Sequence, residues 1–584
     1  MKDETKLIPI AAAFDTTEIK RFRKFIGALQ SDLGEVVSSS QVERVRRLVS
    51  WPSLGSVENP HPTSLFPGED EVVLGGATIV APLAFESAGG DDVLGQLLPY
   101  WVEAAEKEGG TRSQSWTESS FRTLSVSSSS TSVGARINSA LYNIERAARS
   151  KAAQFARSAH YMGSKSTLAP LFVEIMKTLL PADIVVLDLM CGSGAATGAF
   201  SHFWPTLASD AQAFSLRLAA VQGGGMTGAR ARTIGERVLA AARAVFKELP
   251  EHISAEIETE NEFLASDLSE QVIDRLAAWI AAYPRTGNNE SFASHPLKSL
   301  IDERKIDPDA RPFILCSAYY ANLFFGVRQS AEIDCLRAAI EDVVQDETEK
   351  AWALGALICA ISSCAYTYGG HFAQPKIDAT DRARFEKLAP EMLIARGLSV
   401  SHEFYARLSN LGDESENAPF PVQLIRGPWK RALADAEVIS AGRHVCVYLD
   451  PPYTRDEYSR YYHVLETLVR YNYPQVADKP SIPRRGTSSR FASEFATRNV
   501  AQIEETLIQI VQECLARNWY CLWSYSSSGD ANVERVLRAL SDEDATIDIF
   551  SADYAYKAQG RHSAKAVKEY AILISPASEG SRAA

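Results

Sequence analysis

Four consecutive residues, Asp450-Pro451-Pro452-Tyr453, place a carboxylate, two prolines and an aromatic ring directly after the apolar run 445–449. Proline has no backbone N–H, so two of them at the end of a strand stop the β-ladder and stiffen the loop. A stiff loop that presents a hydrogen-bond acceptor and a ring indicates a ligand-binding site. A rigid turn without a ligand is the alternative interpretation.

A glycine turn follows a second apolar run. Residues 184–189 include Asp188 and lead at once into Cys191-Gly192-Ser193-Gly194. Glycines at the carboxyl end of a strand let the backbone approach a ligand closely and leave amide donors free. The turn lacks the Gly-Lys-Ser/Thr ending of a phosphate-binding loop, which disfavours hydrolysis of nucleoside triphosphates. A tight strand-to-helix turn explains the same residues without a ligand.

Asp210 ends the next expected strand, residues 206–209. In doubly wound sheets an acidic residue at this place binds two ribose hydroxyls, whereas the alternative role is a helix N-cap. A long segment of helical pattern follows, and apolar runs at 422–425 and 445–449 then restore the strand pattern. We therefore expect an α/β fold: a doubly wound, Rossmann-like sheet with a large, mainly helical insertion and an additional N-terminal region.

The two motifs, together with Tyr161-Met162-Gly163-Ser164-Lys165, resemble the Dam-like class of S-adenosylmethionine-dependent DNA adenine-N6 methyltransferases. In that class the three motifs occur in this order, and a target-recognition insertion lies before the catalytic loop. The resemblance covers residues 158–211 and 421–575. Its aspartate-proline-proline-tyrosine motif is specific for methylation of exocyclic amines, whereas the glycine turn supports only the fold.

The resemblance implies a cofactor site for S-adenosylmethionine, made of Tyr161, Gly163, Lys165, Asp188, Cys191, Gly192, Gly194 and Asp210. Lys165 would border the methionine carboxylate, for which a fixed cation is a natural partner; a solvated surface lysine is the alternative. Asp450 and the Pro451 carbonyl would accept hydrogen bonds from the target amine and align its lone pair with the methyl group. Tyr453 would stack on an adenine flipped out of the duplex.

Residues 470–498 carry six basic side chains against two acidic ones, although the whole chain has a formal net charge of −13. An acidic protein must hold DNA through a local basic patch. Arg484, Arg485 and Arg490 are our candidate phosphate contacts, with an ordinary solvated face as the alternative. Aromatic pairs at 319–320 and 324–325 suit either a DNA-facing surface or a helical core.

The resemblance and the composition together divide the chain into six parts. These are an N-terminal region of unknown role (1–118), a serine-rich linker (119–134), the cofactor-binding half of the methyltransferase domain (135–211), a helical insertion for target recognition (212–420), the catalytic half (421–575) and a flexible tail (576–584). The first part, the linker and the tail contain no motif with recognisable chemistry.

Composition limits the cellular setting. The 584 residues include eight cysteines without a C-x-x-C pair, which favours buried core thiols in a reducing compartment over zinc ligands or disulfides. The apolar stretch 351–368 carries serines, a threonine and alanines, so a buried helix is favoured over a membrane span. We expect a cytoplasmic protein that needs neither a metal nor a membrane.

Two departures from the class stand out. Met190-Cys191 replace an aromatic residue before the glycine, and no acidic residue follows strand 422–425 near the expected cofactor adenine, for which Asp267 is a candidate substitute. The expected function is site-specific methylation of double-stranded DNA at adenine-N6, in restriction-modification or phage defence. Cytosine-N4 methylation, or a methyltransferase-like DNA-binding subunit with protein partners in a defence complex, are the alternatives.

Overall fold

The computed structural model describes residues 165, 168–266, 268–286, 292–368, 370–453, 457–477, 481–540, 543, 545–556 and 565–577, and two short strands, β1 (Glu71–Leu74) and β2 (Ala77–Val80). β1 and β2 pair with each other in antiparallel orientation. Tyr161, Gly163, Asp267 and the linker at 119–134 lie outside the described residues.

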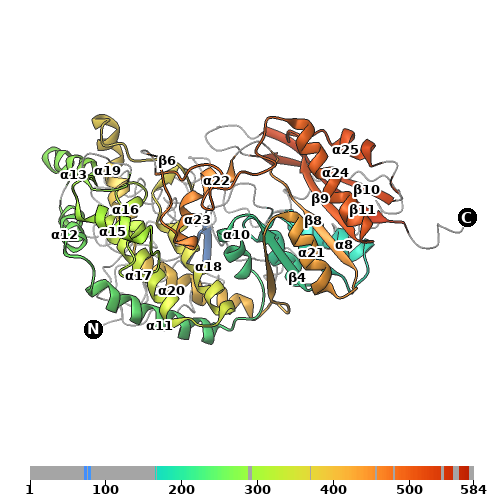
Figure 1. Ribbon diagram of the computed structural model, residues 1–584, viewed down its shortest axis with the longest axis horizontal. Coiled ribbons are helices and arrows are strands. Elements are labelled where there is room, and N and C mark those ends of the chain that lie inside the picture. Colours follow the sequence, from blue (N-terminus) through green and yellow to red (C-terminus); the bar gives the residue numbers. More distant parts are fainter. Residues whose placement is uncertain are drawn as a thin grey trace, which may run out of the picture.

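Seven strands form one mixed sheet in the order β10-β11-β9-β8-β3-β4-β7 (Figure 1). Their bounds are β3 Val185–Asp188, β4 Thr206–Asp210, β7 Val422–Arg426, β8 Val445–Leu449, β9 Tyr520–Ser526, β10 Ala545–Tyr556 and β11 Lys565–Pro576. The five strands from β9 to β7 are parallel, and β10 and β11 form an antiparallel hairpin on one side. The α/β sheet and the four strands expected before residue 450 are confirmed.

Helices cover both faces of the sheet. On one face pack α8 (Ala169–Leu179) and α9 (Ala195–Ser201), and on the other α21 (Trp429–Ser440), α24 (Val500–Ala516) and α25 (Val533–Ala539). Alternate residues of β3 enter different layers, because Val186 faces the α8 side while Val185 and Leu187 face the α24 side. A strand buried on both faces is apolar along its whole length, which explains the continuous run in the sequence.

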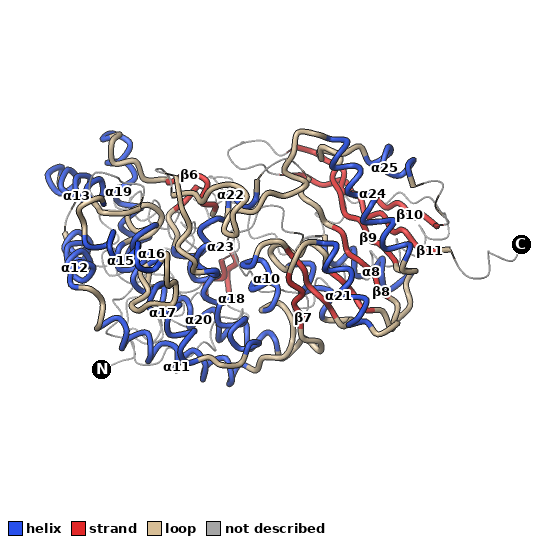
Figure 2. The backbone as a smooth tube through the Cα atoms, in the orientation of Figure 1, coloured by secondary structure: helices blue, strands red, loops and turns tan. Residues whose placement is uncertain are grey.

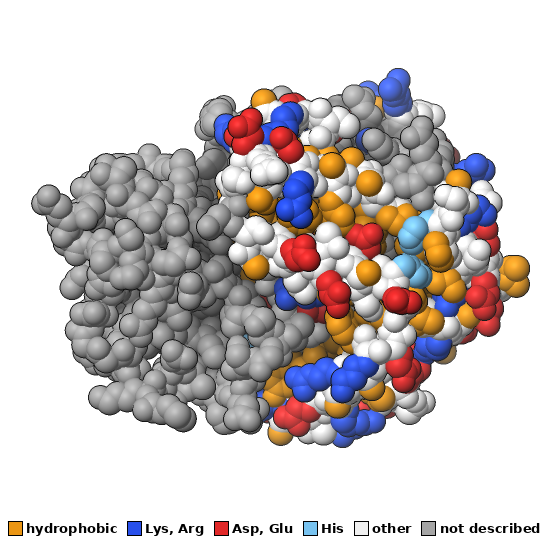
Figure 3. Space-filling view, turned by 90° about the vertical axis from the view of Figure 1, so that its left-hand side faces the viewer, with side chains coloured by type: hydrophobic (Ala, Val, Ile, Leu, Met, Phe, Trp, Pro, Cys, Tyr) orange, Lys and Arg blue, Asp and Glu red, His pale blue; other side chains and the backbone are white. Residues whose placement is uncertain are grey.

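Between β4 and β7 the chain forms a second, mainly helical lobe (Figures 1 and 2). Its elements are α10 (Ala213–Ala220), α11 (Gly228–Lys247), α12 (Glu251–Ala265), α13 (Glu270–Ala282), α15 (Pro296–Arg304), α16 (Leu315–Tyr319), α17 (Val327–Val343), α18 (Glu347–Cys364), β5 (Thr367–Tyr368), β6 (His371–Pro375), α19 (Arg382–Gly397) and α20 (Val400–Ser415). One large apolar core joins most of these helices. Among the described residues on the face seen in Figure 3, basic and acidic side chains are interspersed, so this face shows no single-sign surface.

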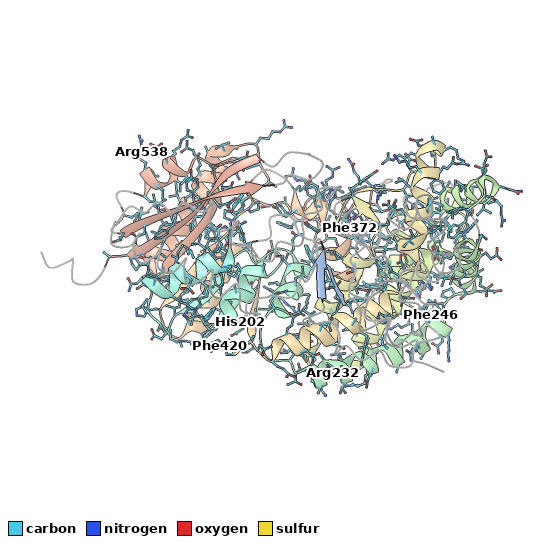
Figure 4. The ribbon with its side chains drawn as sticks, turned by 180° about the vertical axis from the view of Figure 1, so that it is seen from behind. His202, Arg232, Phe246, Phe372, Phe420 and Arg538 are labelled. Carbon is cyan, nitrogen blue, oxygen red and sulfur yellow. The ribbon has the colours of Figure 1, made fainter. Side chains whose placement is uncertain are left out.

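The aromatic residues of the insertion pack in that core. Tyr319, Tyr320, Phe324 and Phe325 are all buried, and Phe324 meets the ring of Phe372 edge-on at 5.2 Å between centroids. Figure 4 places Phe372 close to the junction of the two lobes. The described geometry therefore favours the core interpretation of these residues over a DNA-facing surface.

The segment after the Asp450–Tyr453 loop leaves the sheet and packs in the helical lobe. The segment with α22 (Tyr458–Tyr461) and α23 (His463–Arg470) follows β8, yet its buried side chains belong to the core of the helical lobe. Buried Glu466 of α23 accepts a hydrogen bond from the backbone of Phe214 at 3.1 Å, at the start of α10. This segment therefore connects the loop that follows β8 to α10, the helix that follows β4.

Candidate active site

A cavity of about 270 Å³ runs along the carboxyl edge of the parallel strands. Asp450 follows β8, Asp188 ends β3, Asp210 ends β4, and Trp429 comes shortly after β7. All four residues line the cavity, and the strand order β8-β3-β4-β7 places them in a row. The structure thus brings the two sequence motifs and Asp210 to one site, where doubly wound sheets bind their ligands.

Asp188 is 1% exposed, and one of its two carboxylate oxygens accepts a hydrogen bond. The hydroxyl of Thr197 donates to Oδ2 at 2.6 Å, whereas Oδ1 has no hydrogen-bond partner among the described residues. Burial raises the pKa of Asp188 to about 7, and the neighbouring carboxylate of Asp450 adds to the rise. A buried acceptor oxygen without a partner on a cavity wall is suited to a donor or a cation from a ligand.

The backbone amides of the glycine turn donate hydrogen bonds to other groups of the protein. Gly192 donates its N–H to Asp210 Oδ2 at 3.0 Å, and Gln212 donates to Oδ1 at 2.8 Å. Gly194 donates to the Cys191 carbonyl at 2.7 Å. The expectation of free amide donors is therefore wrong for Gly192 and Gly194, because the Asp210 carboxylate and the turn itself satisfy them. Burial raises the pKa of Asp210 to about 6.

Gly194 serves the packing of two helices. It has φ +77° at the start of α9 and does not line the cavity. A Cβ at this position would lie 2.8 Å from the Cα of Ala219 in α10, which is closer than two carbons approach. Cys191 lines the cavity and packs beneath the turn with Ala208.

Gly194→Ala is expected to destabilise the fold more than Gly442→Ala. Both glycines have left-handed φ, +77° and +81°, where a non-glycine residue costs about 1–2 kcal/mol. Of the two, the Gly194 variant adds a clash with backbone, since no atom of the described residues lies within 4 Å of a Cβ on Gly442. Urea unfolding of both variants measures the difference, and equal losses of unfolding free energy would contradict the packing role.

Lys165 forms an ion pair with the carboxylate of Asp450, the first residue of the Asp450–Tyr453 loop. Its Nζ lies 3.0 Å from Asp450 Oδ1, and the two side chains are 10% and 16% exposed. The same ammonium lies 4.4 Å from the ring centroid of Tyr453. Burial raises the pKa of Asp450, and the charge of Lys165 opposes this rise. Lys165 is thus a cavity residue and not a solvated surface lysine.

The Tyr453 hydroxyl forms polar contacts with side chains of two strands, β9 and β11. Its hydroxyl donates to Glu569 Oε2 of β11 at 3.0 Å and lies 3.1 Å from the Ser524 hydroxyl of β9. Burial raises the pKa of Glu569 to about 7. These contacts anchor the hydroxyl end of Tyr453, and the Lys165 ammonium lies over one face of its ring. Pro451 and Pro452 line the cavity beside it.

The candidate DNA-contacting arginines have different surroundings. Arg490 pairs with Glu457 at 2.7 Å and is 17% exposed, so it ties its own segment to the cavity wall. Arg485 also reaches Glu457, at 3.3 Å, but is 54% exposed. Arg484 is exposed. Arg484 and Arg485 therefore have the accessibility that phosphate contacts need.

Three residues of the site were not predicted from the sequence: Trp429 and Glu494, which line the cavity, and Glu569 of β11, which accepts a hydrogen bond from the Tyr453 hydroxyl. The Trp429 ring donates its Nε1–H to Glu494 Oε2 at 2.8 Å, and both side chains line the cavity. No local pattern marks them, since each is a single residue in an ordinary polar or strand context. The strand order places Trp429 and Glu569, and the segment before α24 places Glu494.

All eight cysteines are buried, as the sequence predicts. Within the described ranges, no three His, Cys, Asp or Glu side chains converge in a way that could hold a metal ion. Among the described helices, none has the length and apolarity to cross a bilayer.

No protein-family model matches the chain. The chain is similar to the type II methyltransferase M.FokI of Planomicrobium okeanokoites, with 24% identity over 275 residues. The match covers 45% of this chain and 36% of the relative, so it spans little more than a third of the relative's length. The sheet and this similarity agree with an α/β protein of methyltransferase type.

Proposed function

We propose that this chain is a DNA methyltransferase that transfers a methyl group from S-adenosylmethionine to the N6 amine of a flipped-out adenine. One observation carries the proposal. The Asp450-Pro451-Pro452-Tyr453 loop lies at the end of β8, in the same cavity as Asp188 and Asp210 at the ends of the next two strands. The similarity to a type II methyltransferase supports DNA methylation in general.

The cavity suits a cationic ligand. Among the described residues, its acidic lining consists of Asp188, Asp210, Asp450, Glu457 and Glu494, and its basic lining of Lys165. S-adenosylmethionine carries a sulfonium and an ammonium group, which favour a site rich in carboxylates. Its ammonium would meet Asp188, whose Oδ1 has no partner among the described residues, and its ribose would meet Asp210. When bound, the cofactor supplies the activated methyl group.

The loop residues would orient the target amine. Asp450 and the Pro451 carbonyl accept hydrogen bonds from its two hydrogens, which directs the nitrogen lone pair toward the methyl carbon. The nitrogen–carbon bond would form as the sulfur–carbon bond breaks, S-adenosylhomocysteine would be the leaving group, and the surplus amine proton would then pass to solvent. The Lys165 ammonium pairs with Asp450 and covers one face of the Tyr453 ring. It must therefore move before the target amine can bind Asp450 and the target base can stack on Tyr453.

DNA would be held next to the cavity. Arg484 and Arg485 are exposed on the segment that also contributes residues 491–496 to the cavity wall. Side chains there can reach phosphates on either side of the flipped base. A role in restriction-modification or phage defence, in the cytoplasm, forms part of the proposal, and the similarity to a type II methyltransferase is its support.

Transfer of tritiated methyl groups from S-adenosylmethionine to mixed duplex DNA tests the proposal. We expect label in N6-methyladenine after digestion and nucleoside analysis. Label in N4-methylcytosine would instead support the cytosine alternative, which uses similar geometry. A folded chain that binds the cofactor but transfers no label would favour a subunit that acts only with protein partners.

Cofactor affinity is expected to rise between about pH 6 and pH 8, because a bound cation favours the ionised form of Asp188. Burial raises the pKa of Asp188 to about 7, so its carboxyl binds a proton at the lower pH and loses it on cofactor binding. Calorimetry in two buffers of different ionisation enthalpy counts the released protons. Asp188→Asn removes this group, and undiminished proton release in that variant would contradict the assignment.

A further inference from the structure

The helical lobe holds a buried arginine outside the cavity lining. Arg285 follows the end of α13, is 8% exposed, and its Nη1 has no hydrogen-bond partner among the described residues. The backbone of the next residue, Thr286, donates to the Ala318 carbonyl at 2.7 Å and accepts a hydrogen bond from the Ser481 hydroxyl at 2.9 Å. Arg285 is therefore buried where the insertion meets the segment that follows α23.

The charge of Arg285 lacks a counter-charge among the described residues. Burial lowers the pKa of its guanidinium, and the two titratable groups that also act on this pKa are Tyr283 and Arg396. Tyr283 is neutral at neutral pH, because burial raises its pKa well above the ordinary value, and Arg396 is a second cation. A guanidinium keeps its proton in proteins, and a buried charge destabilises a fold strongly unless it is paired.

Arg396 of α19 has a carboxylate partner, but that carboxylate is shared. Arg396 is 1% exposed, and its Nη1 lies 3.1 Å from Glu260 Oε1, while its Nε and Nη2 have no hydrogen-bond partner among the described residues. Glu260 also accepts the backbone N–H groups of Val327 and Arg328, at 3.0 and 2.9 Å, at the start of α17. Two buried guanidinium groups and one carboxylate leave a positive charge of the described residues uncompensated.

We propose that Arg285 binds a small inorganic anion, chloride or phosphate, and that Arg396 is the second cation of this site. Buried water can accept a hydrogen bond from Nη1, but it carries no charge that would neutralise the guanidinium. A free anion suits the depth of Arg285 better than a phosphate of a DNA backbone, which stays at the protein surface. The bound anion stabilises the helical lobe and is independent of the proposed methyl transfer.

Thermal melts of the full chain test the site when chloride or inorganic phosphate replaces gluconate, a bulky anion, at constant ionic strength. The melting temperature of the wild type should rise by a few degrees and reach a plateau, as for any ligand that binds the folded state. Arg285→Met keeps the unbranched stem and removes the charge. This variant should lose the rise, and in gluconate it should melt at or above the wild type. Arg243→Met, on an exposed arginine of α11, should keep the wild-type rise.

Three results would overturn the proposal. An equal rise in the wild type and in Arg285→Met would be a general salt effect, and no rise in the wild type would leave water as the occupant. A rise with a short DNA duplex but with neither anion would assign Arg285 to a DNA phosphate instead. The chloride NMR line width of the wild type gives a readout that does not depend on a variant that folds: bound chloride broadens the line, and added phosphate should narrow it again.

Discussion

Asp450→Asn is expected to lower the rate of methyl transfer to DNA by about a hundred- to a thousandfold, the loss typical when one oriented polar contact to a transition state is removed. The amide has nearly the same shape but turns a donor toward the amine hydrogens and loses the ion pair with Lys165. Cofactor binding should persist, because Asp188 and Asp210 are unchanged. Single-turnover transfer of labelled methyl groups at saturating cofactor measures the effect.

The same variant should change the titration of Asp188. The Asp450 carboxylate contributes to the raised pKa of Asp188, so its replacement by a neutral amide lowers that pKa and moves the midpoint of proton release on cofactor binding to lower pH. Asp183→Asn, on an exposed residue just before β3, is the matched control and should alter neither quantity. Near wild-type turnover in Asp450→Asn would contradict the role given to the loop.

The strands and both motifs could be predicted because their signals are local. β3 and β8 are buried on both faces, so their sequences are continuously apolar. The shortness of these apolar runs identifies them as strands. The stiff loop and the positive φ at residue 194 are likewise visible in the sequence, because they require proline and glycine. Parallel pairing then brings the ends of β8, β3 and β4 together without further information.

The local sequence does not specify which hydrogen bonds form between groups on different strands of the sheet. The Gly192 amide was expected to be free, but the Asp210 carboxylate takes it, and this contact depends on the twist and register of β3 and β4. Glu569 and Glu494 reach the site from β11 and from a loop far along the chain. A lone glutamate has no periodicity, so only the folded topology gives it a role.

The segment after the catalytic loop shows the same limit on a larger scale. Its apolar residues have an ordinary helical spacing, which fits a helix on the sheet as well as one in the helical lobe. In the structure Tyr471 donates to Asp334 of α17, and the core of the helical lobe includes Leu465 and Leu468 of α23. This choice of partner is set by long-range packing, which periodicity does not report.

Lys165→Met is expected to move the acid limb of the pH–rate profile to higher pH and thereby to reduce turnover at neutral pH. Asp450 must be ionised to accept hydrogen bonds from the amine, and its pKa is raised by burial and lowered by Lys165. Loss of an opposite charge at 3.0 Å raises the pKa of Asp450 further. Methionine keeps the unbranched stem and removes only the charge. Single-turnover rates between about pH 6 and pH 10 measure the shift.

A second readout distinguishes this role from cofactor binding alone. The Lys165 ammonium pairs with Asp450 and lies over the Tyr453 ring, where the target base would bind. Removal of the ammonium therefore frees that space. Lys165→Met should bind a duplex with an unpaired adenine more tightly in the absence of cofactor. Lys177→Met, on an α8 lysine outside the cavity lining, should leave both quantities unchanged. If Lys165→Met weakens only cofactor binding and leaves the acid limb in place, the lysine acts on the methionine carboxylate and its contact with Asp450 has no part in catalysis.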